Sequence, residues 1–431
     1  MLPVHKGHIH FGLIGIGLLI CSMITACNPS VENPTPVVSP TPPLATALPM
    51  EPSKQPDNEF QSITIWIPPR FAPDTPAGSL LSEHLSIFED AYALINIDLR
   101  VKEENGPSGI LEILSSASLV APSTLPEIVL LDPNALNTAA LKGLISPLEE
   151  IIPIPKTPEW YPFAIEAAFV DNTFFGLPFL SEAEAFAYRK ESFEAEPKDW
   201  ADLLSSAETF LIPIGDPESK FSLIQYIAMG GKVIDDRGSP IIDTALLTDL
   251  FNFYLSANEA GLLPLYSLQL QSTDDTWIAL MQGNTNAAVI PLEAFQEGST
   301  SVTFLVTPWP TRDGSGVVPT MTLSWAVVAK DHEQYDHISQ VLQWLCEPTF
   351  LGKISQSLGL IPATSTALQE WTSSDSSAIL SRLIRVAVPE PSIEEITTFG
   401  PLLRSAIEDV LNGRSTPETA AESISDQVKI P

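Results

Sequence analysis

The sequence contains few cysteines and few basic residues. The first shortage limits the disulfides that the chain can form, and the second limits the partners that it can bind. Of its three cysteines, only Cys346 lies beyond residue 27, so the body of the chain cannot form a disulfide within itself and depends on its hydrophobic core. The 53 acidic residues outnumber the 21 basic ones and give a net charge of −32. This balance disfavours nucleic acid and anionic lipid headgroups as partners.

Common catalytic motifs are also missing. The sequence has no G-x-S-x-G or S-x-x-K pattern and no G-K-[ST] phosphate loop. The histidines beyond residue 27 are His84, His332 and His337. The last two are five residues apart, a spacing that does not place both on one helical face for a zinc ion. We therefore expect no cofactor, no metal and no catalytic residue.

The apolar stretch near the N-terminus, residues 11–23, is too short to span a bilayer. It follows Lys6 and ends at Ile24-Thr25-Ala26-Cys27, which is the order of a secretory signal. A cysteine directly after small residues resembles the lipobox of bacterial lipoproteins, which implies removal of residues 1–26 and acylation of Cys27. Two acyl chains would hold the protein on the extracytoplasmic face of the bacterial cell membrane without a transmembrane helix.

The segment after this cysteine is rich in proline. Residues 28–58 contain nine prolines and little hydrophobic periodicity, a composition that favours extended chain and cannot bury a core. We interpret residues 27–58 as the acylated cysteine and a semi-rigid tether. The rest, about 370 residues, exceeds what one core usually serves and predicts two lobes.

The body opens with a pattern of alternating strands and helices. Residues 62–67, 97–102 and 127–131 read as strands, and apolar residues at helical spacing lie between them. This order predicts an α/β fold with a parallel sheet. Ligands of such sheets bind beyond the carboxyl ends of the strands, where Trp66 and Asp132 lie.

Six separated segments of the body stand out as motifs: Ile63-Thr64-Ile65-Trp66, Leu125-Pro126-Glu127-Ile128-Val129, Gly143-Leu144-Ile145-Ser146-Pro147-Leu148, Phe175-Gly176-Leu177-Pro178-Phe179 with Tyr188, Gly230-Gly231, and Gly413-Arg414-Ser415-Thr416-Pro417-Glu418-Thr419-Ala420-Ala421. In their order these segments resemble the carbohydrate-type family of extracellular solute-binding proteins, which serves ATP-driven importers and includes maltose-binding protein.

The resemblance implies a two-lobe, periplasmic-binding-protein-like class II fold with a hinge and an interlobe cleft. Residues 59–168 with 284–326 are expected to form the first lobe, and 169–283 with 327–431 the second. The implied function is capture of a small polar solute, a carbohydrate, by a monomer that closes around it and delivers it to the membrane permease subunits of an ABC importer. Only the lipid anchor is expected to contact the membrane.

A sugar site needs apolar rings against C–H faces and charged acceptors for hydroxyl groups. By position in the family's motifs, Asp132 and Glu182 correspond to hydroxyl-binding carboxylates. Trp66, at the end of the first strand, is a candidate ring facing the cleft, and packing under the following loop is the alternative.

The sequence departs from the maltose-type pattern at two stacking positions, one of which falls at about Phe399-Gly400. Pro291-Leu292-Glu293-Ala294 stands where that relative has a tryptophan, and we include Glu293 among the predicted ligand contacts. Trp277, Trp309 and Trp325 are candidates for a relocated stacking surface. Trp325 is preferred because it lies where the chain recrosses between the lobes.

Two alternatives remain at this stage. A sensor lipoprotein would use the same fold to present its ligand to a receptor. A surface glycoside hydrolase would use paired carboxylates of the cleft catalytically. An enzyme turns its substrate over, whereas a binding protein is stabilised by a ligand that stays unchanged.

Overall fold

The computed structural model describes residues 61–428, apart from residues 236, 299–303, 329–330 and 373. The predicted signal peptide, Cys27 and the proline-rich tether lie outside this part of the chain. Within it, none of the helices has the length and apolar character needed to cross a bilayer.

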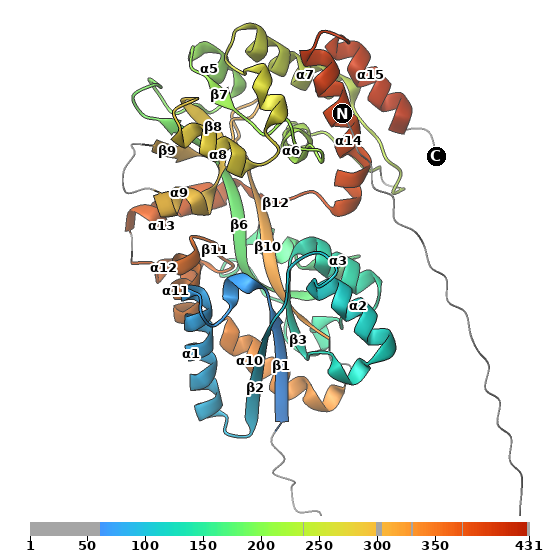
Figure 1. Cartoon of the computed structure of the whole chain (residues 1–431), viewed down its shortest axis with the longest axis vertical. Coiled ribbons are helices and arrows are strands. Elements are labelled where there is room, and N and C mark those ends of the chain that lie inside the picture. The colour runs from blue at the N-terminus through green and yellow to red at the C-terminus, as the bar shows by residue number, and fades with distance from the viewer. Residues whose placement is uncertain (1–60, 236, 299–303, 329–330, 373, 429–431) are drawn as a thin grey trace, which may run out of the picture. The chain divides into compact units, whose positions relative to one another are not determined.

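The first half of the body is built on the predicted parallel sheet (Figure 1). Strand β1 (Gln61–Ile67) pairs in parallel with β2 (Ile95–Val101) on one side and with β3 (Ile128–Leu131) on the other. The helices of this lobe are α1 (Pro76–Ala91), α2 (Ile110–Val120), α3 (Pro133–Leu141), α10 (Tyr335–Leu345), α11 (Pro348–Leu358) and α12 (Ser365–Gln369).

Helix α1 shows why the local pattern was readable. Thr75 precedes it, and its side chain accepts a hydrogen bond from the Gly78 backbone N–H at 3.0 Å, which stabilises the helix start. Leu81, Leu85 and Phe88 recur on one face and are buried against the sheet, as their spacing predicts.

Two long antiparallel strands connect the halves of the molecule. Strand β6 (Gly176–Arg189) pairs along its first part with β10 (Val318–Val327), and β10 also pairs with β3. The second part of β6 pairs with β8 (Ala287–Pro291) and β9 (Phe304–Thr307). One sheet of ten strands therefore runs through the described residues from β2 to β7.

The second lobe surrounds the outer part of this sheet. Its short strand β7 (Phe210–Leu211) pairs in parallel with β8. Its helices are α5 (Trp200–Ser205), α6 (Lys220–Ala228), α7 (Thr244–Glu259), α8 (Thr273–Met281), α9 (Leu292–Gly298), α14 (Ile393–Leu411) and α15 (Pro417–Val428). The elements that remain are β4 (Phe169–Val170), β5 (Thr173–Phe174), α4 (Pro162–Glu166), β11 (Ile361–Pro362), α13 (Ser374–Leu383), β12 (Ala387–Pro389) and six short 3₁₀ turns.

The cores assign two segments differently from the sequence-based expectation. Residues 284–326 were expected in the first lobe, but β8 and Trp309 pack with the second-lobe core because β8 pairs with the far end of β6. Residues 327–431 were expected in the second lobe, but α10 and α11 bury their apolar faces against the core that contains β1. The chain thus returns to the first lobe through β10 and leaves it again after α12.

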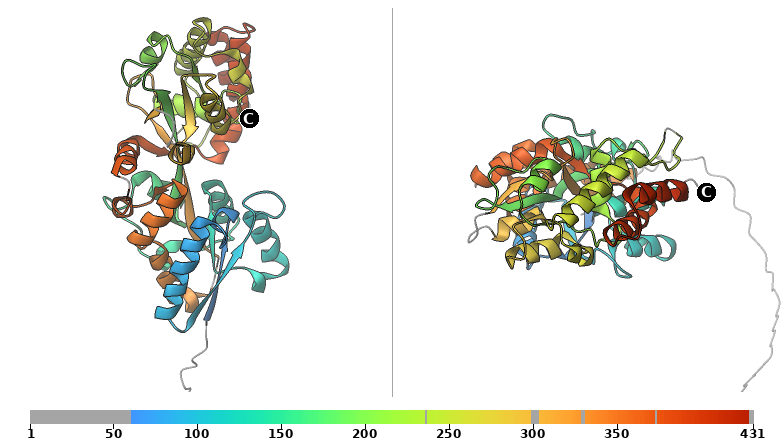
Figure 2. Two further views of the ribbon diagram at one scale, coloured as in Figure 1. Left: turned by 60° about the vertical axis from the view of Figure 1, so that its left-hand side comes forward. Right: turned by 90° about the horizontal axis from the view of Figure 1, so that it is seen from above.

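Each half of the sheet is covered by helices on both faces (Figure 2). The first lobe has two apolar clusters, one containing Ile65 and Phe88 and the other containing Val129 and Leu136. The second lobe is held mainly by a cluster that includes Phe251. Helix α14 contributes its buried face to that cluster.

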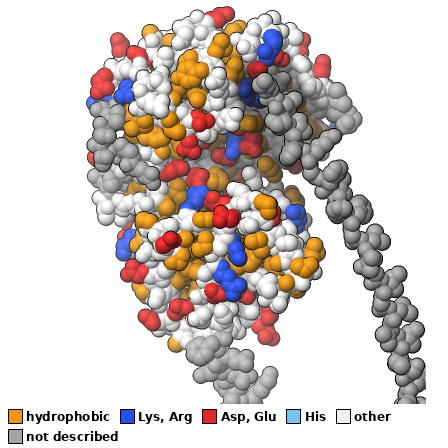
Figure 3. Space-filling view, viewed as in Figure 1, with side chains coloured by type: hydrophobic (Ala, Val, Ile, Leu, Met, Phe, Trp, Pro, Cys, Tyr) orange, Lys and Arg blue, Asp and Glu red, His pale blue; other side chains and the backbone are white. Residues whose placement is uncertain are grey.

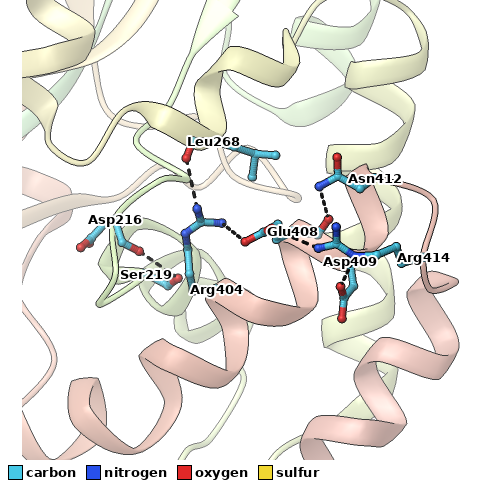
Figure 4. A network of polar contacts seen from close by, with 8 residues as sticks. All are labelled: Asp216, Ser219, Leu268, Arg404, Glu408, Asp409, Asn412 and Arg414. Atoms are coloured by element: carbon cyan, nitrogen blue, oxygen red, sulfur yellow. Dashed lines mark hydrogen bonds and ion pairs between the residues drawn. The ribbon is translucent and has the colours of Figure 1, made fainter. Parts of the chain in front are cut away.

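The Gly413–Ala421 tail identified in the sequence has a structural role. Helix α14 ends just before Gly413, which has a φ of +69° that glycine adopts without strain. The Arg414 side chain turns back to Glu408 at 3.1 Å and to Asp409 at 2.6 Å (Figure 4). These contacts fix the turn into α15, where Pro417 is the first helical residue.

Candidate functional site

Three adjoining pockets lie along the middle of β6 and β10, where the two lobes meet. Their volumes are about 300, 280 and 140 Å³. Asn134 and Met321 line the first two, and Glu390 lines the second and third. Acidic and basic side chains gather across the waist of this face (Figure 3). We take these adjoining pockets as the cleft between the lobes.

The first of them, the Arg70 pocket, contains the predicted residue Asp132. Arg70 follows β1, and its guanidinium binds Glu104 at 2.9 Å and also pairs with Glu182 of β6. Asp132 lies at the N-terminus of α3, where its Oδ1 accepts hydrogen bonds from the backbone N–H groups of Asn134 at 2.8 Å and Ala135 at 3.0 Å. Asp132 therefore caps a helix and lines the pocket at once.

The smallest pocket, which we call the acidic pocket, lies on the second-lobe side of β6 and β10, which we call the hinge strands because they connect the lobes. Its lining residues are Glu182, Ala183, Glu184, Thr273, Asp274, Pro291, Glu293, Pro319 and Glu390. Two of these glutamates share a face of β6 because strand side chains alternate, and the intervening Ala183 is buried. A third glutamate, Glu293, lies close to them because Glu184 pairs with Pro291 at the end of β8. Glu293 follows two residues later, as the second residue of α9.

Burial and mutual repulsion raise the pKa values in the acidic pocket. Burial raises the pKa of Glu184 to about 8, and the nearby carboxylates of Glu390 and Glu293 add to the effect. Burial likewise raises the pKa of Glu293 to about 7, with Glu182 adding to it. The pKa of Glu390 is also raised by burial, against the attraction of Lys220.

Only some of the carboxyl groups in the acidic pocket have a hydrogen-bond donor or a cation beside them. Thr273 donates its hydroxyl to Glu184 Oε1 at 3.0 Å. The Lys220 Nζ lies 3.8 Å from Glu390 and 3.5 Å from Glu218. Glu293 Oε2 is buried and has no hydrogen-bond partner among the described residues.

Lys220 is the first residue of α6, lines the second pocket, and follows a loop that α14 supports. Its backbone N–H donates to Asp216 Oδ2 at 3.0 Å. Gly400 of α14 packs so closely under this loop that an added Cβ would lie 2.2 Å from the Glu218 carbonyl oxygen. Further along the helix, Arg404 donates to the Leu268 carbonyl at 3.1 Å (Figure 4).

The two tryptophans proposed as ligand contacts are buried instead. Trp66 is 3% exposed and packs in a core cluster with Val129, with Lys102 Nζ lying 5.1 Å from its ring centroid. Trp325 is fully buried, and its ring centroid lies 5.0 Å from that of Phe179. Neither ring lines the three pockets, because helices cover both faces of the sheet and the rings fill core space. Contact of these two rings with a ligand stays a prediction.

The other two candidates for a relocated stacking surface, Trp309 and Trp277, also lie outside the three pockets. Trp309 is fully buried in the second-lobe core, and Trp277 packs near Phe304 with its ring centroid 6.1 Å away. Among the residues that line the three pockets, Phe169 is the one aromatic side chain. The cleft is therefore lined by charged, polar and aliphatic groups, with little aromatic surface.

The sequence model of one family, described as bacterial extracellular solute-binding protein, matches residues 96–379. The chain belongs to this family. No curated protein matches it.

Solved structures of solute-binding proteins share the fold of this one. Maltose-bound MalE3 of T. maritima is 16% identical, with a TM-score of 0.64 and 85% of this chain and 99% of that chain covered. MalE of Xanthomonas citri is 16% identical, with a TM-score of 0.69 and 85% and 96% covered. The cyclic alpha-maltosyl-1,6-maltose binding protein of Arthrobacter globiformis is 15% identical, with a TM-score of 0.70 and 85% and 97% covered.

These matches confirm the predicted family and the two-lobe α/β fold. The protein is a solute-binding protein and not an enzyme, as predicted. At such low identity the likeness shows the fold, so the contacts of this solute-binding protein have to be argued from its own side chains.

Several cleft residues escaped the sequence analysis. Glu184 was readable, because it follows the predicted Glu182 by two positions on the same strand and so shares its face. Arg70 lies just after Pro68-Pro69, where no pattern predicts its partner. Lys220 and Glu390 are far apart in the sequence and meet only through the second-lobe packing.

Proposed function

We propose that this solute-binding protein captures a small polar solute, a carbohydrate, in the cleft formed by the three pockets and delivers it to the permease subunits of an ABC importer. The observation that carries the proposal is the set of ionisable side chains at the hinge strands of a chain that belongs to this family. Carboxylates and guanidinium groups bind hydroxyls through charge-assisted hydrogen bonds. The named structural relatives include maltose-bound T. maritima MalE3.

We also propose that Asp132, Glu182 and Glu293 contact the ligand. All three line the cleft pockets, and they approach it from different elements: the start of α3, the middle of β6 and the start of α9. A ligand held by all three would touch both lobes and favour the closed arrangement.

The lipid anchor is part of the same proposal and rests on the sequence alone. Acylation of Cys27 after removal of residues 1–26 would keep the protein beside its permease on the outer face of the membrane. A tether over residues 27–58 would allow the lobes to reach the permease.

A thermal-shift screen of the full-length protein against mono- and oligosaccharides and polyols tests the function. We expect at least one solute to raise the melting temperature in a concentration-dependent way, because a ligand that binds only the folded state stabilises it. Chromatography of the same mixtures should recover that solute unchanged. Product formation, or no stabilisation by any polar solute, would overturn the proposal.

Variants of Asp132 separate ligand contact from helix capping. Asp132→Asn keeps a side-chain acceptor for the N-terminus of α3 but removes the charge, and we expect weaker ligand binding with little loss of stability. Asp132→Ala should lose the same affinity and also about 1 kcal/mol of unfolding free energy. Calorimetry and urea unfolding measure the two effects. If both variants bind normally, Asp132 serves only as the cap of α3.

A further inference from the structure

The acidic pocket has more negative groups than the cleft can neutralise. Five acidic side chains line it, and none of its lining residues is basic. They are Glu182, Glu184, Asp274, Glu293 and Glu390. These acids come from β6, α8, α9 and the segment after β12, so separate parts of the fold converge on one cavity.

The two nearby cations are already shared with acids outside this pocket. Arg70 binds Glu182 and also Glu104 at 2.9 Å. Lys220 lies between Glu390 at 3.8 Å and Glu218 at 3.5 Å. Among the described residues, neither cation forms an ion pair with Glu184 or Glu293. The pocket therefore keeps an excess of negative charge when its carboxyl groups ionise.

Two carboxyl groups of the acidic pocket, those of Glu184 and Glu293, have unused hydrogen-bonding capacity. Glu293 Oε2 is buried and lacks a partner among the described residues. Glu184 accepts from Thr273 at Oε1, and a carboxylate has room for further donors on its second oxygen. Burying an unpaired charge is costly, and the group takes up a proton instead. This cost accounts for the raised pKa values of Glu184 and Glu293, and a bound cation would remove it.

The rest of the pocket wall selects against recognition by stacking. Besides the acids and Thr273, it is made of Ala183, Pro291 and Pro319. None of these is an aromatic ring that could stack on the C–H side of a neutral sugar. Recognition in this pocket therefore depends on charge and hydrogen bonding. The described residues also include no group of His, Cys, Asp or Glu side chains arranged to hold a metal ion.

We propose that the solute carries a protonated amine, which enters the acidic pocket and donates hydrogen bonds to Glu184 and Glu293. This inference rests on the proposed function, because it names the chemical class that the same cleft takes. An ammonium group supplies three donors and a full charge, and its hydrogen bonds to carboxylates are stronger than those of a neutral hydroxyl. Asn134, Asp132 and Arg70 in the neighbouring pocket remain available to hydroxyl groups of the same solute.

Matched pairs of solutes test this inference by titration calorimetry of the full-length protein. The probes are glucosamine, galactosamine and mannosamine, each beside its neutral parent hexose, together with the linear diamine 1,4-diaminobutane. We expect at least one amine probe to bind about tenfold or more tightly than its neutral counterpart. Raising the salt from about 50 to about 500 mM should weaken that binding, because salt screens charge pairs.

Three variants locate the effect. Glu293→Gln and Glu184→Gln keep the shape of the side chain and remove its charge, so each should weaken the amine probe by about tenfold or more. Glu418→Gln is the matched control, since Glu418 is an exposed residue on α15, and it should bind the probe like the wild type. A circular-dichroism melt of each variant establishes that it is folded.

The outcomes separate this inference from the function beneath it. Binding of a neutral saccharide with no amine probe bound would overturn the inference and leave the solute-binding function standing. Binding of calcium chloride alone would overturn it as well. If none of the amine probes and none of the neutral saccharides binds, both the inference and the proposed function are overturned. Equal amine affinity in the wild type and in both glutamine variants would also contradict the inference.

Discussion

Replacing Trp325 by alanine is expected to lower the free energy of unfolding by about 3–5 kcal/mol, the usual cost of emptying a buried aromatic site. The side chain is fully buried on β10 and packs against Phe179 in the core of the first lobe. Because β10 also pairs with β3 and β6, a cavity there weakens the strand that connects the lobes. Urea unfolding measures the loss.

Trp325→Phe is the matched control. The Trp325 Nε1 has no hydrogen-bond partner among the described residues, so phenylalanine gives up volume but no polar contact. We expect it to cost about 1–2 kcal/mol and to bind ligand like the wild type. Normal stability with lost ligand binding in Trp325→Phe would show instead that Trp325 is the stacking ring that the sequence analysis proposed.

The parts of the fold that depend on neighbouring residues were predictable. The spacing of Leu81, Leu85 and Phe88 predicts α1, because a helix repeats its buried face every three to four residues. The three opening strands and their parallel pairing follow from the alternation of strands with helices. These features need only a short window of sequence.

The direction of the tryptophans was not predictable in the same way. Along β1, Ile65, Trp66 and Ile67 are all buried, because helices cover both faces of the sheet. Alternation then carries no information on which side faces a ligand. Trp325 lies in a run of buried residues on β10 for the same reason.

Lobe membership depends on pairing between distant segments. Strand β8 joins the second lobe because it pairs with the far end of β6, about a hundred residues earlier in the sequence. Helix α10 joins the first lobe because its apolar face, including Ile338 and Leu342, meets the core beside β1. The periodicity of each segment predicts a buried face but not the partner that covers it.

In the cleft, too, some residues could be predicted from the local sequence and others depend on distant segments. Glu182 and Glu293 were named from their positions in the motifs, and both line the acidic pocket. Glu390 was missed because it follows β12, which pairs with β10, while its partner Lys220 lies on α6 of the second lobe. Arrangements of this kind become visible only when the chain has folded.

The ligand-free protein should lose stability as the pH rises from about 5 to about 8, and Glu184→Gln should remove much of that loss. The pKa of Glu184 is about 8 in the folded protein against an ordinary value of 4.5. The folded state therefore holds a proton that the unfolded state releases. Its contribution to stability is complete below the unfolded pKa and is lost as the pH rises through the folded one.

Burial is the largest cause of this pKa shift. The carboxylates of Glu390 and Glu293 face Glu184 and add to it, while the Thr273 hydroxyl and Lys220 oppose it. The glutamine variant keeps the acceptor for Thr273 but cannot ionise. At about pH 8 it should exceed the wild type by about 1–3 kcal/mol, since a change of one in pKa corresponds to about 1.4 kcal/mol. At about pH 5 the two proteins should be nearly equal.

Urea unfolding at several pH values measures this difference, with Glu418→Gln on exposed α15 as the control that keeps the wild-type profile. The same measurement bears on the ligand. An ammonium group beside Glu184 would favour the ionised carboxylate and lower its pKa, so a saturating amine should flatten the wild-type profile as the glutamine does. Parallel profiles for the wild type and Glu184→Gln would show that this carboxyl group ionises with an ordinary pKa and that its ionisation does not lower the unfolding free energy.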